Sequence, residues 1–248
     1  MGIVEGARHK LLKILGQRRL DTLAEVVVRP LTPEEAIGVG AAGEFPIKRG
    51  RERVVEASFL GARGQAFTDQ PMPFRGTLGS ILELDLSQPG NRAVFVAALN
   101  AVLRHLGLAD GTVHCKEEDP QRCGPEIAEA LVRRFGRRRV GLVGLQPAIL
   151  EALVRTFGPP AVRLVDLNPD NIGKTKHGVK VWDGGARLRD LVAQSDVVLA
   201  TGSSVVNGTI DEIMALCRQA GKPLVFYGNT ISGVAALEKL DRLCPFGQ

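Results

Sequence analysis

Four residues of this sequence carry the donor atoms that soft transition metals prefer. His114, Cys115, Cys123 and Cys244 offer one imidazole and three thiols, the side chains that hold zinc, nickel or copper in proteins. Their spacing differs from that of a compact zinc motif, because seven residues separate Cys115 from Cys123 and no C-x-x-C occurs. His114 and Cys115 would point to opposite sides of an extended chain, so both could reach one ion only from a loop. The sequence therefore predicts a transition-metal site only if the fold brings these residues together.

Three other histidine or cysteine side chains are expected to have structural roles. Cys217 falls within an expected helix and is most simply a small core residue. His105 and His177 are expected at the surface or at caps, although the polar surroundings of His177 leave a ligand contact open.

A second candidate site follows an apolar run at residues 196–200, which is typical of a buried parallel strand. Small polar residues come next, and the expected ligand contacts among them are Thr201, Gly202, Ser203 and Asn207. The sequence Thr209-Ile-Asp-Glu212 matches a capping box, which predicts a helix from residue 209 to about 218. A strand, a loop of small residues and a helix N-terminus would form a polar pocket whose free N–H groups favour an anion or a carbonyl group. The alternative is that these residues only make a tight connection.

Three other expected strands end in residues of the same kind. The predicted contacts at these ends are Gly144 and Gln146, Asp166 and Asn168, and Gly228, Asn229 and Thr230. Because parallel strands bring their carboxyl ends to one edge of a sheet, we expect these loops to share one ligand cleft. Asp166 has the position of the acid that binds ribose in dinucleotide sites, but the loop at Gly144 lacks the G-x-G-x-x-G glycines. Asp166 could instead cap the turn that follows it.

The pattern of expected elements changes near residue 110. Beyond it, short apolar strands alternate with helices, which predicts a parallel sheet in a Rossmann-like domain at residues 111–248. Before it, a helix, an antiparallel meander and a second helix predict a smaller α+β lobe at residues 1–110. The expected helices span 1–24, 91–106, 147–157, 188–194, 209–218 and 232–240, and the expected strands span 25–29, 54–60, 61–67, 139–144, 162–166, 196–200 and 223–227. Residues 78–86 fit either a helix or a strand.

Composition narrows the class of partner. A chain of 248 residues with 44% hydrophobic and 24% charged residues is ordinary for a soluble two-domain protein, and we expect it in the cytoplasm without a membrane partner. The net charge of +5 permits anionic partners without requiring one. Aromatic residues make up only 4%, and no nucleic-acid-reading module is present, so we expect no nucleic-acid partner. Assembly into a homo-oligomer is compatible with this composition.

Five motifs resemble, in the same order, those of a prokaryotic family described as "putative heavy-metal chelation". They are His114-Cys-Lys-Glu-Glu118, Gly144-Leu-Gln-Pro-Ala-Ile-Leu150, Asp166-Leu-Asn-Pro-Asp-Asn-Ile-Gly173, Ala200-Thr-Gly-Ser-Ser-Val-Val-Asn-Gly-Thr-Ile-Asp211 and Tyr227-Gly-Asn-Thr-Ile-Ser-Gly233. Residues 66–69 and 97–101 resemble motifs of the family's first lobe. The resemblance implies an enolase-N-terminal-like lobe followed by a Rossmann-like lobe, and a role in binding metals.

Two hypotheses of different classes follow. The first is a protein that binds a heavy metal or a metal chelate, with a polar small-ligand site in the cleft between the lobes. The alternative is a small-molecule enzyme that holds a nucleotide or an S-adenosylmethionine-like ligand in its Rossmann-like lobe. The mostly neutral hydrogen-bonding groups at the strand ends suit a carboxylate-bearing or nucleoside-like molecule. No histidine is placed to activate Ser203 as a nucleophile.

Overall fold

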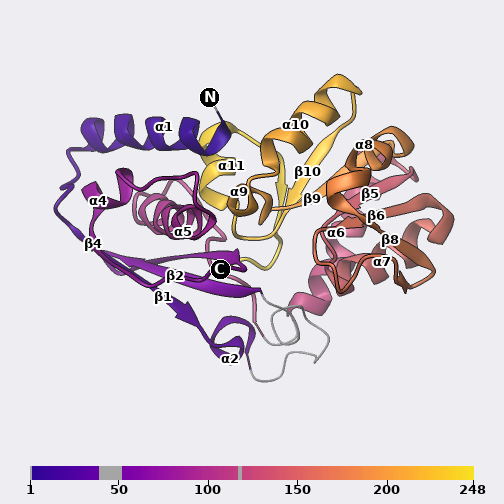
Figure 1. Ribbon diagram of the computed structural model, residues 1–248, viewed down its shortest axis with the longest axis horizontal. Coiled ribbons are helices and arrows are strands. Elements are labelled where there is room, and N and C mark those ends of the chain that lie inside the picture. The colour runs from indigo at the N-terminus through magenta and orange to yellow at the C-terminus, as the bar shows by residue number, and fades with distance from the viewer. Residues whose placement is uncertain (1, 39–51, 117–118) are drawn as a thin grey trace.

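The protein is described here from a computed structural model, which describes residues 2–38, 52–116 and 119–248. The last two residues of the His114 motif lie outside these ranges. The first part of the chain forms a four-stranded antiparallel sheet with the order β3-β2-β1-β4 (Figure 1). Its strands are β1 (Glu25–Leu31), β2 (Arg53–Phe59), β3 (Ala62–Thr68) and β4 (Phe74–Thr77). Its helices are α1 (Ile3–Arg18), α2 (Pro33–Ile37), α4 (Leu78–Leu82) and α5 (Pro89–His105).

The second part of the chain forms a seven-stranded sheet with the order β11-β10-β9-β5-β6-β8-β7. Every neighbouring pair in it is parallel except β7 and β8, which are antiparallel. Its strands are β5 (Val140–Val143), β6 (Val162–Asp166), β7 (Thr175–Lys176), β8 (Val179–Asp183), β9 (Val197–Thr201), β10 (Leu224–Tyr227) and β11 (Arg242–Leu243).

Helices cover both faces of this seven-stranded sheet. They are α6 (Asp119–Phe135), α7 (Pro147–Phe157), α8 (Gly184–Gln194), α9 (Ser204–Asn207), α10 (Ile210–Gln219) and α11 (Ser232–Glu238), with a 3₁₀ turn at Pro159–Ala161. Alternate strand residues face opposite sides, as the pleat requires. On β9, Val197 and Leu199 pack with α6 and α7, whereas Val198 and Ala200 pack with α8 and α10. The strands are therefore buried on both faces, as expected from their continuous apolar runs.

One hydrophobic core joins the two sheets. It contains apolar residues of α1, β1, β2 and α5 together with residues of β9, α9, α10 and α11. Helix α5 lies between the antiparallel sheet and helices α9 and α11, so it is buried nearly all round rather than on one face (Figure 1). The predicted division at residues 110 and 111 stays a prediction, and α5 is the element that both halves share.

Helix α5 packs against β3 with its backbone in direct contact. A Cβ atom added to Gly64 of β3 would lie 2.5 Å from the Ala97 carbonyl oxygen and would also clash with the Ala101 nitrogen. Only glycine allows this approach. The position of α5 relative to the antiparallel sheet therefore depends on one residue without a side chain.

The expected α/β class is confirmed, with an antiparallel α+β unit followed by a mostly parallel sheet. The enolase-like and Rossmann-like details stay predictions. Some local expectations were wrong. Strands β4, β7, β8 and β11 lie in segments where none was expected. The Thr209 side chain does not cap α10 but donates to Asn207 Oδ1 at 2.7 Å. The ambiguous residues 78–86 begin with the short helix α4.

No helix of the described residues is long and apolar enough to cross a membrane.

We expect Gly64→Ala to lower the free energy of unfolding by about 1–3 kcal/mol, because the new methyl group overpacks the contact with α5. Gly16→Ala is the matched control. Gly16 is exposed on helix α1 and has open space around it, so this change should raise stability by up to about 1 kcal/mol. Urea denaturation followed by circular dichroism measures both. Equal effects of the two changes would contradict the close contact.

Candidate functional site

A cavity of about 330 Å³ lies where the antiparallel sheet meets the carboxyl ends of the seven-stranded sheet. Residues from both halves line it, including Phe67, Thr68 and Asp69 from the end of β3. The structure brings all eleven expected ligand contacts to this cavity: Gly144, Gln146, Asp166, Asn168, Thr201, Gly202, Ser203, Asn207, Gly228, Asn229 and Thr230. The four expected metal ligands, His114, Cys115, Cys123 and Cys244, line the same cavity. Residues from distant parts of the chain thus converge on one space.

Asp166, at the end of β6, accepts hydrogen bonds from two of the loops around the cavity, those that contain Leu145 and Asn168. Its Oδ2 accepts a hydrogen bond from the Leu145 N–H at 2.6 Å, and its Oδ1 accepts from the Asn168 N–H at 2.8 Å. The Asn171 side chain also donates to Oδ1, at 3.1 Å. Both carboxylate oxygens therefore already have partners. The turn-capping alternative describes this geometry, and a ribose contact stays an untested prediction.

A side chain of the chain itself also hydrogen-bonds a free N–H group at the N-terminus of α7. Gln146 is its N-cap, and the side-chain Oε1 accepts from the Ile149 N–H at 2.6 Å. Together with Asp166 at Leu145, this bond removes two of the free N–H groups expected to attract an anion. The helix end therefore offers fewer donors to a phosphate than its position suggests.

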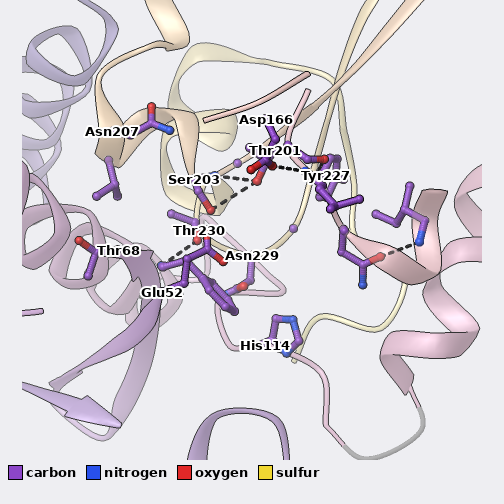
Figure 2. Close-up of a pocket in the computed structure, with 18 of the residues that line it drawn as sticks. Glu52, Thr68, His114, Asp166, Thr201, Ser203, Asn207, Tyr227, Asn229 and Thr230 are labelled. Carbon is purple, nitrogen blue, oxygen red and sulfur yellow. Dashed lines mark hydrogen bonds between the residues drawn. The ribbon is translucent and has the colours of Figure 1, made fainter. Parts of the chain in front are cut away.

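The loop after β9 is shorter and more helical than expected. The single-turn helix α9 lies between Thr201 and α10, so the N-terminus of α10 is not part of the cavity lining. The Ser203 N–H donates to Thr201 Oγ1 at 3.3 Å. Asn207 is exposed, and its Oδ1 accepts from the Thr209 N–H at 3.1 Å. Thr201, Ser203 and Asn207 nevertheless still line the cavity (Figure 2).

Tyr227, the single tyrosine of the chain, hydrogen-bonds the loop at Gly144. Its hydroxyl donates to the Gly144 carbonyl at 2.9 Å, and burial raises its pKa far above the usual value, so it stays a neutral donor. Gly144 has φ of +90°, and an added Cβ would lie 2.8 Å from Thr201 Cγ2. Sequence reasoning found the strand and motif of Tyr227 but not its role. A lone aromatic hydroxyl at a strand end was the available signal.

The β10–α11 loop connects the cavity to the antiparallel sheet. Thr230 Oγ1 accepts from the Phe67 N–H at 3.1 Å (Figure 2). The Asn229 side chain donates from Nδ2 to the Thr112 carbonyl at 3.3 Å. Its Oδ1 is buried and has no hydrogen-bond partner within the described part of the chain.

The four soft side chains line the cavity without forming a complete metal site. Within residues 2–38, 52–116 and 119–248, no group of three or more His, Cys, Asp or Glu side chains is arranged to hold a metal ion. Burial lowers the pKa of His114 to about 4, so its imidazole is neutral at pH 7. Burial also raises the pKa of Cys115 to about 12 and raises those of Cys123 and Cys244, so the thiols carry protons. Metal binding here would require the loss of thiol protons.

Two carboxyl groups that sequence reasoning did not single out also line the cavity, Glu52 and Asp69. Burial, and then repulsion by Asp166 and Asp69, raises the pKa of Glu52 to about 7. Asp69 follows an expected strand and belongs to the motif at residues 66–69, but no ligand role was predicted for it. Glu52 lies outside every expected element, so only the fold could reveal its place. No Lys or Arg of the described residues lines the cavity.

Residues 126–239 match the model of a family described as "putative heavy-metal chelation". Over these residues the chain is similar to that family. The match runs from within α6 to just past α11, so it includes β5 to β10 and the loops that carry the eleven strand-end residues. The antiparallel sheet lies outside the matched residues.

Two solved structures of unknown function, both from this family, resemble the chain. A protein from Pyrococcus horikoshii has a TM-score of 0.56 and 16% identity, and the match covers 92% of this chain and 80% of that one. A protein from Desulfitobacterium hafniense has a TM-score of 0.49 and 15% identity, with 75% and 72% covered. At these identities the first likeness shows a shared fold and nothing about chemistry. No curated protein matches the chain.

Replacing Asp166 tests its fastening role. We expect Asp166→Ala to lower the free energy of unfolding by about 1.5–3 kcal/mol, because the backbone N–H groups of Leu145 and Asn168 lose a charged acceptor. Asp170→Ala, in the same loop but exposed, should change it by less than about 0.5 kcal/mol. Guanidinium chloride titrations compare the two. An unchanged free energy of unfolding in Asp166→Ala would mean that the carboxylate is free for a ligand.

Proposed function

We propose that the protein binds a heavy metal together with a small chelator in the cavity between the two sheets. The observation that carries this proposal is the convergence of four soft ligands and four strand-end loops on one space. The soft side chains suit the metal, and the loops suit the organic part of the complex. The family description of residues 126–239 agrees with a metal-handling role.

A chelate fits the cavity better than a bare ion. The described side chains offer no ready group of three ligands, so an incoming ion would have to bring part of its own coordination shell. A volume of about 330 Å³ leaves room for a small organic molecule. His114, as a neutral imidazole, and one or more of the thiols could then complete the coordination. Such donors favour zinc, nickel or copper.

The alternative enzyme has less support from the geometry. A nucleotide needs free N–H groups for its phosphates, but Leu145 N–H and Ile149 N–H already bind Asp166 and Gln146. An adenosyl ligand without phosphates would need Asp166 for its ribose, and both oxygens of that carboxylate have partners.

Metal binding by protein purified without a polyhistidine tag tests the proposal. We expect Ni²⁺ or Zn²⁺, supplied as amine complexes, to bind with a stoichiometry near one. Cys115→Ala should weaken binding roughly tenfold or more, because loss of a metal ligand costs at least as much as loss of a group that supports one. Cys217→Ala is the matched control, since Cys217 is buried in the core away from the cavity.

Isothermal titration calorimetry, with elemental analysis of the dialysed protein, measures both variants. Retained S-adenosylmethionine or nucleotide in the purified protein, with no metal and no titratable metal complex, would contradict the proposal and favour the enzyme. Equal weakening by Cys115→Ala and Cys217→Ala would show that the thiols act only through stability.

The polar loop after β9 should contribute to the same affinity. We expect Ser203→Ala and Asn207→Ala each to weaken binding of the metal complex by about threefold to tenfold, the effect of one lost hydrogen bond. The melting temperature should hardly change, because Asn207 is exposed and, within the described residues, the Ser203 side chain makes only one long hydrogen bond, with Thr201 Oγ1 at 3.4 Å. Differential scanning fluorimetry with and without the complex separates the two effects. A large fall in melting temperature with unaltered affinity would make these residues purely structural.

A further inference from the structure

The sign of the charge inside the cavity differs from that of the whole chain. The chain carries a net charge of +5, yet the ionisable side chains lining the cavity, within the described residues, include the carboxyls of Glu52, Asp69 and Asp166 and no Lys or Arg. Charges in a partly enclosed cleft act on a ligand more strongly than charges spread over an open surface. The cavity therefore attracts positive charge.

Glu52 is a carboxyl group of the cavity lining that is available to a ligand. None of the hydrogen bonds or ion pairs of the described residues involves its carboxylate. Its high pKa, about 7, arises from burial and from the negative charges of Asp166 and Asp69, and no cation of the described residues offsets them. A bound cation would supply the missing favourable interaction.

An independent observation points to a hydrogen-bond donor on the ligand. Asn229 is 1% exposed and lines the cavity, and its Oδ1 has no partner within the described residues. The amide orientation follows from its Nδ2, which donates to the Thr112 carbonyl. A buried acceptor without a donor is unfavourable, so this site lacks an N–H or O–H group that a ligand would bring. Figure 2 shows Glu52 and Asn229 on the same side of the cavity.

We propose that the cavity selects a positively charged metal complex of an amine-type chelator, whose N–H groups face Glu52 and Asn229. This inference rests on the proposed function and adds the charge and the donor groups of the chelator. An amine nitrogen that binds a metal through its lone pair keeps its N–H hydrogens. The same nitrogen can therefore hold the metal and donate a hydrogen bond to Glu52 or Asn229. The metal would face the His114 and Cys115 end.

A polycarboxylate chelator lacks these properties. It brings acceptors and negative charge to a wall that already holds three carboxyl groups. The nearby N–H groups of Leu145 and Ile149, which could have received a carboxylate, are occupied. The expectation of an anion or carbonyl ligand at these strand ends therefore gives way to a cation that donates hydrogen bonds.

Two nickel complexes of opposite charge test the inference. One is Ni²⁺ with triethylenetetramine, which carries two positive charges, and the other is Ni²⁺ with nitrilotriacetate, which carries one negative charge. We expect the untagged full chain to bind the amine complex at least tenfold more tightly at pH 7.5 in isothermal titration calorimetry. Glu52→Gln should weaken the amine complex roughly tenfold and leave the nitrilotriacetate complex unchanged or tighter, as expected for loss of a charged acceptor.

Glu151→Gln is the control, because Glu151 is an exposed carboxylate on α7 that does not line the cavity. It should leave both affinities unchanged. Equal binding of the two complexes, or tighter binding of nitrilotriacetate, would overturn the charge selection. If Cys115→Ala still weakens both complexes in that case, the proposed function stands without the inference. Failure of both complexes and of Ni²⁺ alone to bind would overturn the proposed function and the inference together.

Discussion

The arrangement of the two sheets depends on the hydrogen bonds of the Asn100 side chain. This side chain is fully buried in the middle of α5. Its Nδ2 donates to the Gln65 carbonyl of β3 at 2.9 Å and to the Thr230 carbonyl at 3.0 Å, while its Oδ1 accepts from the Gly233 N–H at 2.7 Å. One amide therefore satisfies backbone groups of the antiparallel sheet and of the loop that follows β10. Because buried backbone groups left without partners are costly, this network fixes where the two halves meet.

The cavity is a consequence of that meeting. The backbone carbonyl of Gln65 accepts the bond from Asn100. The Gln65 side chain accepts from the His114 N–H at Oε1, at 2.8 Å, and donates from Nε2 to Glu56. His114 and Thr230, which both line the cavity, are therefore both anchored to β3, one through Gln65 and the other through the bond from the Phe67 N–H. The four expected metal ligands line one space without forming a closed metal site.

The sequence predicted four strands of the seven-stranded sheet, β5, β6, β9 and β10, because apolar runs and parallel topology are local and general signals. It missed the short strands β7 and β11, and it missed β8, although Val179, Val181 and their polar neighbours alternate as a strand should. It misread Thr209, because the competing acceptor on Asn207 is visible only once the intervening turn of α9 is known. The convergence of His114 with Cys244 depends on the whole fold, and no spacing rule could have shown it.

Of all the features of the site, the sign of the charge that lines the cavity is the one that the amino-acid composition could least reveal. The arginine-rich stretch at residues 133–139, at the end of α6 and just beyond it, places its positive charge at the surface. Arg134 pairs with Asp241, and Arg139 pairs with Asp196 at 2.8 Å and holds the pKa of that carboxyl far below its usual range. Exposed pairs of this kind are screened by solvent and hardly act at a distance. The preference of the site is instead set by the few charges that the fold encloses, so a basic chain can carry a cavity that attracts cations.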